Sequence, residues 1–476
     1  MTSPRTSANT YPPQQDPFLN LLEAPLARLA EGFRDLPPFV SPLDQATDRD
    51  AMALVLDEVA GRMVNNYPYF HPLYAGQMLK PPHPVARAAY ALAMAINPNN
   101  HARDGGRASS QMEIEAVAQI AQMFGWSGAG YLGHLTSGGT FANLEALWIA
   151  GQLAPGKRIL ASEQAHYTHK RITAVLQLPF TSIACDLRGC MDLNTLEEEL
   201  KRGDVGTVVV TMGSTALGSV DPLPGILALR SRYEFRIHLD AAYGGYFRLI
   251  AEELDAPARS AYLAMDQADS IVVDPHKHGL QPYGCGCVLF RDPSVGRFYK
   301  HDSPYTYFTS SELHLGEISL ECSRAGASAV ALWATQRLLP LTPDGEFARG
   351  LSAGRSAALE LHHRLRNDSR FDPFSEAPQL DIVVWQMRAG SAAQSSSLAQ
   401  QVFDECAVQN LHLALVQLPE AMFRDHGANE NVEIDAMDTS SMVTCLRSVL
   451  MKPEHAQWLG SIWERLSLAT NKCVHL

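Results

Sequence analysis

The middle of the chain contains short apolar runs, each bounded by turn residues, that alternate with stretches of helical periodicity. Strands that are buried on both faces have this composition, because helices cover both sides of a parallel sheet. The pattern predicts an α/β fold with a mostly parallel, doubly wound sheet. The six predicted strands are 158–161, 181–184, 208–212, 235–239, 270–273 and 287–290.

Three parts of the chain differ in their predicted secondary structure. Residues 1–75 read as a flexible tail (1–16) followed by helices over 18–34 and after Asp48, which we expect to form interface material. Residues 76–341 carry the predicted sheet and form the large domain. In residues 342–476 helices and strands mix, which predicts a smaller α+β domain. Its predicted elements are helix 347–366, strand 380–386, helix 396–409 and strands 411–417 and 442–450.

One helix in the large domain is predicted from the spacing of its apolar residues by threes and fours. Its expected buried face consists of Met112, Ile114, Val117, Ala121 and Phe124.

The composition excludes several classes of protein. Hydrophobic residues make up 46% of the 476 and charged residues 19%, which is enough apolar material for a large core. The net charge of -13, without a basic run, argues against nucleic-acid binding. The longest apolar stretch, 88–96, is too short to cross a membrane, and no signal peptide is recognisable. We therefore expect a soluble, cytoplasmic protein.

The eight cysteines do not form a metal-binding pattern. The only tight pair, Cys285 and Cys287, has no second Cys/His pair at zinc spacing. We expect no metal site and a set of reduced thiols, as in a reducing cytosol.

A lysine follows one of the predicted strands in the sequence SIVVDPHKHG. Most lysines are solvated surface residues. Lys277, however, lies between a buried strand and a second, glycine-punctuated strand, and ligands bind at strand ends in open parallel sheets. An amine at that position can form an imine with an aldehyde cofactor.

A carboxylate follows another strand, in RIHLDAAYGG. Asp240 can be a metal ligand, a helix cap or a cofactor partner. Pyridoxal-phosphate chemistry needs such a carboxylate to keep the pyridine nitrogen protonated, so that the ring accepts electrons. The small residues after Asp240 suit packing against a flat ring.

Two further features lie upstream. Thr136-Ser-Gly-Gly-Thr-Phe-Ala-Asn143 opens a helix, and glycines at a helix N-terminus let backbone N–H groups approach a phosphate. By itself such a cluster is often only a loop. His166 can stack on a pyridine ring, or it can be a surface or capping residue.

The order of these features, Gly-rich turn, His, Asp and Lys, resembles the group II pyridoxal-phosphate-dependent amino-acid decarboxylases. The likeness runs from about Tyr67 to Pro340 and more weakly to the end. The strings HLDAAYGGYF and ADSIVVDPHKHGLQPYGCG look most like bacterial tyrosine decarboxylases, and less like the aromatic-amino-acid and glutamate decarboxylases. The strings SRAGA, NPNN and MEIEAV add to the likeness.

The resemblance implies the fold-type I (aspartate-aminotransferase-like) scaffold and a role for each matching residue. Lys277 would hold pyridoxal 5'-phosphate as a Schiff base, and Asp240 would pair with the ring nitrogen. His166 and Ala242 would pack on opposite faces of the ring, with Thr215 nearby. Gly138, Gly139, Thr140 and His276 would hold the phosphate, and Arg447 would seat the substrate carboxylate.

The resemblance also implies a loop tyrosine that returns a proton after carbon dioxide leaves. The string PYTYFTSS offers Tyr305 and Tyr307, and the register between them stays open. Residue 278 is His where relatives carry other residues, and we expect it to fill space.

Substrate choice is less constrained. Tyr69, Phe70 and Tyr74 suit an aromatic side chain, whereas His71 and Gln77 suit a polar or acidic one. We expect an L-amino acid, with an aromatic one favoured over glutamate, aspartate, cysteine sulfinate or diaminobutyrate. The open alternatives are another lyase or an aldehyde-forming reaction on the same scaffold, and a non-catalytic module that binds the cofactor. Family members are homodimers with the active site at the interface, so the resemblance implies the same here.

Overall fold

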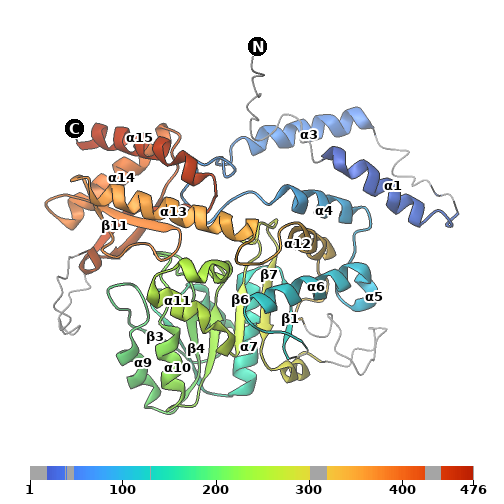
Figure 1. Ribbon diagram of the computed structural model, residues 1–476, viewed down its shortest axis with the longest axis horizontal. Helices are drawn as coiled ribbons and strands as arrows, with labels where there is room; N and C mark the ends of the chain where they lie inside the picture. The colour runs from blue at the N-terminus through green and yellow to red at the C-terminus, as the bar shows by residue number, and fades with distance from the viewer. Residues whose placement is uncertain are drawn as a thin grey trace.

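The computed structural model describes residues 19–37, 39, 48–128, 130–300, 319–423 and 441–474. The tail expected at 1–16 lies outside these ranges. Two sheets organise the described chain, a large one in its middle and a small one toward the C-terminus (Figure 1). The division at 75/76 and 341/342 stays a prediction.

The large sheet has seven strands, and the α/β class is confirmed. β7 is antiparallel to both of its neighbours, and the pairs from β6 across to β3 are parallel. In spatial order the strands are β1 (Leu132–Thr136), β7 (Gly286–Phe290), β6 (Ser270–Val273), β5 (Arg236–Asp240), β4 (Val205–Thr211), β2 (Arg158–Ser162) and β3 (Phe180–Ile183).

Helices cover both faces of this sheet. Successive residues of β6 show this, because they belong to different apolar clusters. Ile271 and Val273 belong to one apolar cluster with α6 (Ala108–Met123), whereas Val272 belongs to another with α7 (Gly139–Leu153). Successive residues of a strand point to opposite faces, so α6 and α7 lie on opposite sides. The doubly wound arrangement is therefore confirmed. The remaining helices here are α5 (Arg103–Gly106), α8 (Thr168–Val175), α9 (Leu193–Leu200), α10 (Leu223–Arg230), α11 (Ala256–Leu263) and α12 (Gly326–Leu338), with 3-10 turns η2 (Gly245–Glu253), η3 (Met265–Gln267) and η4 (Pro293–Phe298).

The predicted buried face of α6 was partly wrong. Val117, Ala121 and Phe124 are buried, but Ile114 is 44% exposed and Glu113 is 1% exposed. Glu113 is buried because Arg324 forms an ion pair with it, a partner that lies more than 200 residues away. Apolar spacing along one helix does not reveal such a partner.

The small sheet is antiparallel, with strand order β10-β11-β9-β8. Together with its helices it forms the smaller α+β unit that the sequence predicts. Its strands are β8 (Phe371–Pro373), β9 (Ile382–Met387), β10 (Ala414–Pro419) and β11 (Met442–Val449), and its helices are α13 (Glu346–Arg366), α14 (Ala392–Val408) and α15 (His455–Val474), with the 3-10 turn η6 (Glu420–Phe423).

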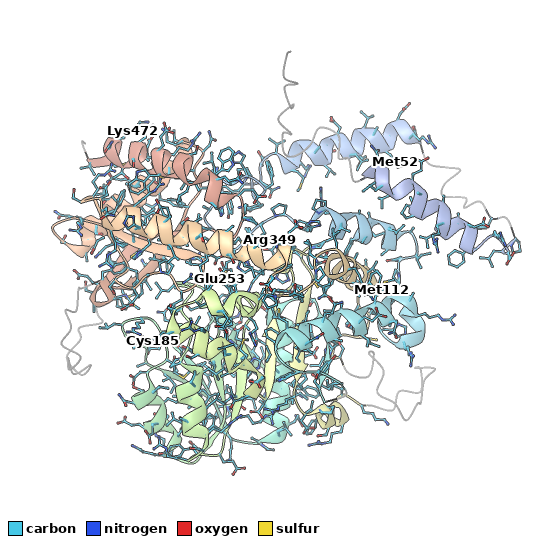
Figure 2. All side chains as sticks on the ribbon, viewed as in Figure 1. Met52, Met112, Cys185, Glu253, Arg349 and Lys472 are labelled. Carbon is cyan, nitrogen blue, oxygen red and sulfur yellow. The ribbon has the colours of Figure 1, made fainter. Side chains whose placement is uncertain are left out.

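The N-terminal helices extend away from this body (Figure 1). Here α1 (Glu23–Gly32) follows the 3-10 turn η1 (Leu19–Leu22), and α3 (Arg49–Met63) begins where the Asp48 side chain accepts from two backbone N–H groups. Neither helix buries a residue, and Figure 2 shows Met52 of α3 far from both sheets. The next helix, α4 (Pro84–Met94), packs on α12. No helix in the described ranges combines the length and the apolar character that a membrane span needs.

Candidate active site

The sheet brings Asp240 and Lys277 together. β5 ends at Asp240, which pairs with Val272 of the parallel neighbour β6, and β6 ends at Val273, one residue before Asp274. The turn that follows β6 carries Lys277. Because parallel strands end at the same edge of a sheet, both side chains face one cleft, where ligands of open α/β sheets bind.

A cavity of about 400 Å³ opens at this edge. Nine of the residues proposed from the sequence line it, and they come from segments spread over 140 residues of chain. They are Gly138, Gly139, Thr140, His166, Thr215, Asp240, Ala242, His276 and Lys277.

Asp240 is held as an anion. Its side chain is 6% exposed, and Oδ2 lies 2.7 Å from Nε2 of His169. The Ala242 N–H donates to its Oδ1 at 3.2 Å. Burial alone would raise the pKa of Asp240, but the hydrogen bond and charge of His169, with the charge of Lys277, lower that pKa well below its usual range. An anion at this position is suited to pair with a protonated pyridine nitrogen.

Lys277 has its own acidic neighbour. Its Nζ lies 3.1 Å from Oδ2 of Asp274, which is 2% exposed. Nε2 of His276 lies 3.6 Å from the same oxygen, and Nδ1 of His276 contacts the Cys285 carbonyl at 2.8 Å. Burial lowers the pKa of His276, which favours its neutral form.

The Gly-rich turn lies directly against Asp274. Gly138 has φ +150, and it is the N-cap of α7, with no side chain capping the helix. A Cβ at Gly139 would lie 2.5 Å from Oδ2 of Asp274. Only glycine therefore fits, and the uncapped N–H groups of the 15-residue helix face the cavity edge.

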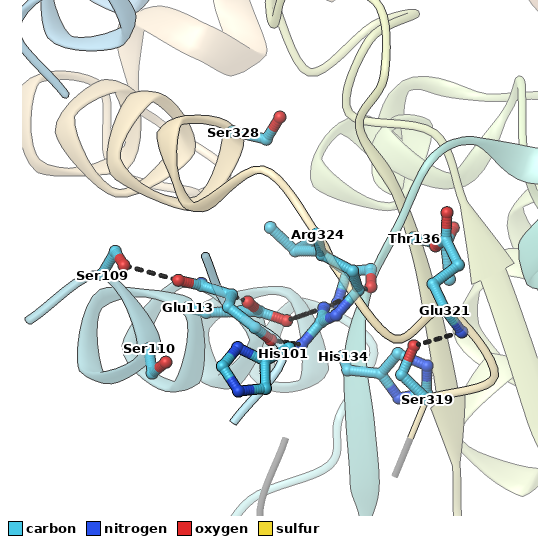
Figure 3. A network of polar contacts seen from close by, with 12 residues as sticks. His101, Ser109, Ser110, Glu113, His134, Thr136, Ser319, Glu321, Arg324 and Ser328 are labelled. Atoms are coloured by element: carbon cyan, nitrogen blue, oxygen red, sulfur yellow. Dashed lines mark hydrogen bonds and ion pairs between the residues drawn. The ribbon is translucent and has the colours of Figure 1, made fainter. Parts of the chain in front are cut away.

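A buried polar network holds the start of this turn (Figure 3). Arg324 donates to Glu113 Oε1 at 2.6 Å, to the Leu135 carbonyl at 2.8 Å and to the Asn100 carbonyl at 2.8 Å. The N–H of Leu135, in β1, donates back to Glu113. The strings NPNN, MEIEAV and SRAGA, which are far apart in the sequence, thus meet beside the strand that leads into the turn.

The same region is tied to the turn by Glu321. Its Oε2 accepts from the Ser137 N–H at 3.0 Å, and its own N–H donates to Ser319. The segment after residue 318 is therefore fixed to the turn that we assign to phosphate binding.

His166 lies in the cavity wall, with Nδ1 2.7 Å from Oγ1 of Thr168. Burial lowers its pKa; Asp240 opposes this shift and Lys277 adds to it. A neutral imidazole is suited to lie against a flat ring.

Three other proposed residues do not line this cavity. Arg447, in β11, is 4% exposed, and its Nη1 lies 3.3 Å from Oε1 of Gln77. Tyr74 is buried beside Tyr69, with ring centroids 4.8 Å apart. His71 accepts from the Leu73 N–H and packs edge-on against Trp458 of α15. Tyr305 and Tyr307 lie outside the described residues.

His278 fills space in part, as expected, but it also joins a polar cluster. It is 1% exposed between the rings of Tyr243 and Phe247, and its Nε2 lies 3.3 Å from Oδ2 of Asp381. Burial lowers its pKa well below the usual value, as do the charges of Lys80 and Lys277.

The sequence interpretation missed His169 and Asp274. Both stand three residues from a residue that was identified, His166 and Lys277, within the same motifs. A spacing of three places two side chains on one side of a helical turn, and this signal was available.

These residues fit pyridoxal phosphate. An amine, a buried carboxylate, a neutral imidazole and an uncapped helix N-terminus surround one cavity, and each suits a different part of that molecule. No group of three or more His, Cys, Asp or Glu side chains in the described part of the chain is arranged to hold a metal ion.

Comparison with known families decides the class. The model of the pyridoxal-dependent decarboxylase conserved domain matches residues 65–388, more than half of the chain. The chain belongs to the pyridoxal-dependent decarboxylases. Its fold, its cofactor class and its standing as an amino-acid decarboxylase follow, and the resemblance noted from the motifs is confirmed.

Curated relatives of this decarboxylase include bacterial enzymes. An L-tyrosine decarboxylase of Enterococcus faecium is 27% identical over 432 residues, covering 68% of this chain and 68% of the relative. The L-tyrosine decarboxylase of Levilactobacillus brevis is 26% identical, with 62% of this chain and 63% of the relative covered. A probable L-tyrosine/L-aspartate decarboxylase of Methanothermobacter thermautotrophicus is 29% identical over 266 residues, covering 55% of this chain and 70% of the relative.

Solved structures agree on the fold. The structure of Oryza sativa TDC with PLP and tryptamine superposes on this decarboxylase with a TM-score of 0.75 at 17% identity, covering 99% of each chain. Mouse CSAD gives a TM-score of 0.73 at 20% identity, covering 94% of this chain and 91% of the other. At these identities the likeness is one of fold.

Proposed function

We propose that this decarboxylase converts an aromatic L-amino acid, of the tyrosine, DOPA or phenylalanine class, to the amine and carbon dioxide. The observation that carries the proposal is the placing of Lys277, Asp240 and the uncapped turn at Gly138 around one cavity, in a chain of this family.

Pyridoxal phosphate, when bound, supplies a conjugated ring that accepts the electrons left when carbon dioxide departs. The protein's contribution is to position the cofactor and to polarise its ring. Lys277 offers the amine that holds the cofactor. Asp240, kept anionic with the help of His169, would pair with the ring nitrogen of the bound cofactor, and it is in place before charge moves, which is electrostatic preorganisation.

Other residues are suited to orient the cofactor and to exclude water from the cavity. His166 and Ala242 lie on the cavity wall, where they are placed to sandwich the ring, and Thr215 lies nearby. The glycines at 138 and 139, with Thr140 and His276, border the phosphate end. Asp274 accepts the ammonium of Lys277 whenever the lysine is free, so the amine stays within reach for release of product.

The preference for an aromatic substrate rests on the aromatic lining. Phe141 and Tyr243 border the cavity, and Tyr283 packs on His276 with centroids 4.7 Å apart. The rings of Tyr69 and Tyr74 pack edge-on against each other, with centroids 4.8 Å apart. The names of the tyrosine decarboxylases among the relatives point the same way.

An acidic substrate is the second candidate, because Arg447 is incompletely paired. Its Nε and Nη2 are buried and find no hydrogen-bond partner in the described residues, and burial lowers its pKa. A buried cation with free donors suits a carboxylate. If Arg447 takes the α-carboxylate, the aromatic proposal stands. If it takes a side-chain carboxylate, aspartate or glutamate would be the substrate, as the name of one relative allows.

We further propose a cytoplasmic homodimer whose active sites lie at the interface. The exposed apolar side chains of α1 and α3 support a partner surface, since such a patch is costly to leave in water. The eight free cysteines are compatible with a reducing compartment. The exposed side chains on these helices are Leu26, Met52, Leu54, Val55, Leu56, Val59 and Met63, and Leu21 of the preceding turn η1 is exposed as well.

The test is a screen for carbon dioxide release from the twenty amino acids, DOPA, cysteine sulfinate and diaminobutyrate. Release from tyrosine, DOPA or phenylalanine, reduced at least tenfold in Arg447→Met, supports the proposal. Release from aspartate or glutamate alone would select the second candidate. An aldehyde product, or no release from any of them, would contradict both.

A further inference from the structure

A second cavity, of about 560 Å³, lies on the other side of the turn that carries Lys277. Lys277 lines the first cavity and its neighbour His278 lines the second. The second cavity is bordered by the segment 80–84 before α4, the first turns of α13 and the segment 452–454 before α15. No residue is shared between the two cavity walls.

Two lysines of this second cavity have no anionic partner among the described residues. Lys452 is 3% exposed, and its Nζ donates to the Tyr74 carbonyl at 2.6 Å. Lys80 is half-buried, and its Nζ donates to the Met451 carbonyl at 3.3 Å. Neither lysine forms an ion pair with any of the described residues. Each ammonium group has three donors, so each keeps unused hydrogen-bonding capacity.

Nearby acidic side chains do not neutralise Lys452 and Lys80. Glu454 and Glu346 line the same cavity, but both are exposed at its rim, and neither lies within ion-pair distance of a lysine. Asp381 attracts Lys80 and accepts from the Tyr243 hydroxyl. Burying a cation without a counter-ion is costly, so a ligand that supplies the opposite charge would stabilise the ammonium forms of these lysines.

Much of the rest of the wall is apolar, although His83, His278, Arg349 and the two glutamates also line it. Phe70, Leu280, Leu339, Phe347 and Leu351 line it together with prolines of the 80–84 segment. A pocket with a cationic floor and apolar sides fits a small molecule that carries one anionic group on an apolar body.

We propose that the second cavity is a binding site for a small carboxylate with an aromatic or aliphatic body, held by Lys452 and Lys80. The site is separate from that of the amino-acid substrate. It adjoins the turn that carries Lys277 through His278, so an occupant contacts the residue next to the cofactor lysine. The inference rests on this cavity and does not depend on which amino acid the enzyme uses.

Binding should be coupled to protons. Burial lowers the pKa of Lys452 to about 7 and that of Lys80 to about 8. A carboxylate beside them favours the ammonium forms, so the complex takes up protons when it forms at a pH above these values. The charged and titratable groups around the two lysines are His71, Tyr74, His278, Asp381, Glu454 and His455, and His83, Glu346 and Arg349 line the same cavity.

The experiment is calorimetric titration of the full-length holoenzyme with benzoate, with benzamide as the uncharged control. Titrations in two buffers of different ionisation enthalpy, at pH 6 and at pH 8, measure the protons exchanged. The variants are Lys452→Met and Lys80→Met. Lys472→Met is the matched control, because Lys472 lies on the surface of α15 and pairs with Glu405.

We expect benzoate to bind, benzamide to bind at least tenfold more weakly, and proton uptake at pH 8 but not at pH 6. Each cavity variant should weaken benzoate binding at least tenfold, and Lys472→Met by less than twofold. Benzoate should bind equally well when the first cavity is saturated with an amino-acid substrate analogue. Competition with that analogue, unchanged affinity in both cavity variants, or no proton uptake at pH 8 would each overturn the proposal.

Discussion

At the scale of the residue, the ionisation of Asp240 depends strongly on His169. Burial opposes the anion, and the contact with His169 at 2.7 Å outweighs it together with the charges of His169, Lys277 and His238. Loss of its hydrogen-bonding partner in a buried site favours the protonated form of a carboxylate, which no longer pairs with a pyridinium.

We therefore predict that His169→Leu weakens binding of pyridoxal phosphate to the apoenzyme at least tenfold, measured by equilibrium dialysis. Lys170→Ala, an exposed neighbour on α8, is the control and should bind as the wild type does. Equal affinity in His169→Leu and the control would show that Asp240 keeps its charge unaided.

The buried Lys452 predicts a pH dependence of stability. Its folded pKa of about 7 lies below the ordinary 10.5, so the unfolded chain binds one more proton between these values. Stability contributed by the neutral lysine is present at high pH and is lost as the pH falls through this window.

Lys452→Met removes this proton-linked term. Relative to wild type, the variant should gain stability progressively as the pH is lowered from about 10 to about 7, with little further change below. Urea midpoints of both proteins at pH 7 and pH 9.5 measure the difference. A constant difference across that range would mean that the lysine is charged in the folded protein throughout.

Site residues were predictable where a motif is typical of one kind of chemistry. Lys277, Asp240 and His166 stand in strings whose order restricts the possible reactions, and the structure places them around one cavity. The burial of Glu113 was not predictable, because it depends on the ion pair with Arg324. The exposure of the neighbouring Ile114 was not predictable either. Partners that are distant in sequence leave no local pattern.

At the scale of the element, the N-terminus of α7 is shaped by close backbone contacts. The Cβ of a residue at 139 would lie 2.5 Å from the Asp274 carboxylate, which is itself held by Lys277. The turn cannot move away without disturbing Lys277, the proposed cofactor lysine.

Gly139→Ala should therefore weaken binding of pyridoxal phosphate at least tenfold, while the fold, followed by circular dichroism, persists. Gly460→Ala in α15 is the matched control, because nothing lies within 4 Å of its Cβ. Alanine favours helix over glycine, so this control should be as stable as the wild type or more so. Normal cofactor affinity in Gly139→Ala would exclude the turn from the site.

Elements were predictable where the apolar run was continuous. β6 has the predicted bounds, and the other five predicted strands of the large sheet differ by one to three residues at their ends. β1 (LGHLT) was missed because its glycine and buried histidine break the apolar pattern; His134 is buried only because Glu145 of α7 pairs with it at 2.7 Å. β8 has three residues, too few for a pattern.

At the scale of the whole molecule, α1 and α3 are the helices with the least tertiary support that the described residues show. A helix that buries no residue has little tertiary support, and helices of 10 and 15 residues are marginal by themselves in water. The exposed Leu56 and Val59 are therefore expected to contact a second copy.

The double variant Leu56→Glu/Val59→Glu should raise the dissociation constant of the dimer at least tenfold, measured by sedimentation. Glu58→Gln on the same helix is the control, since its side chain already faces solvent in an exposed pair with Arg62. A monomeric, fully active wild-type enzyme would contradict the dimer.

The central claim is that Lys277 holds the cofactor. Reduction of the holoenzyme with borohydride fixes an imine as a stable amine, and peptide mass spectrometry locates it. We predict that the pyridoxyl group is found on the peptide containing Lys277 and is absent from Lys277→Ala. A label on another lysine, or none after incubation with pyridoxal phosphate, would contradict the account.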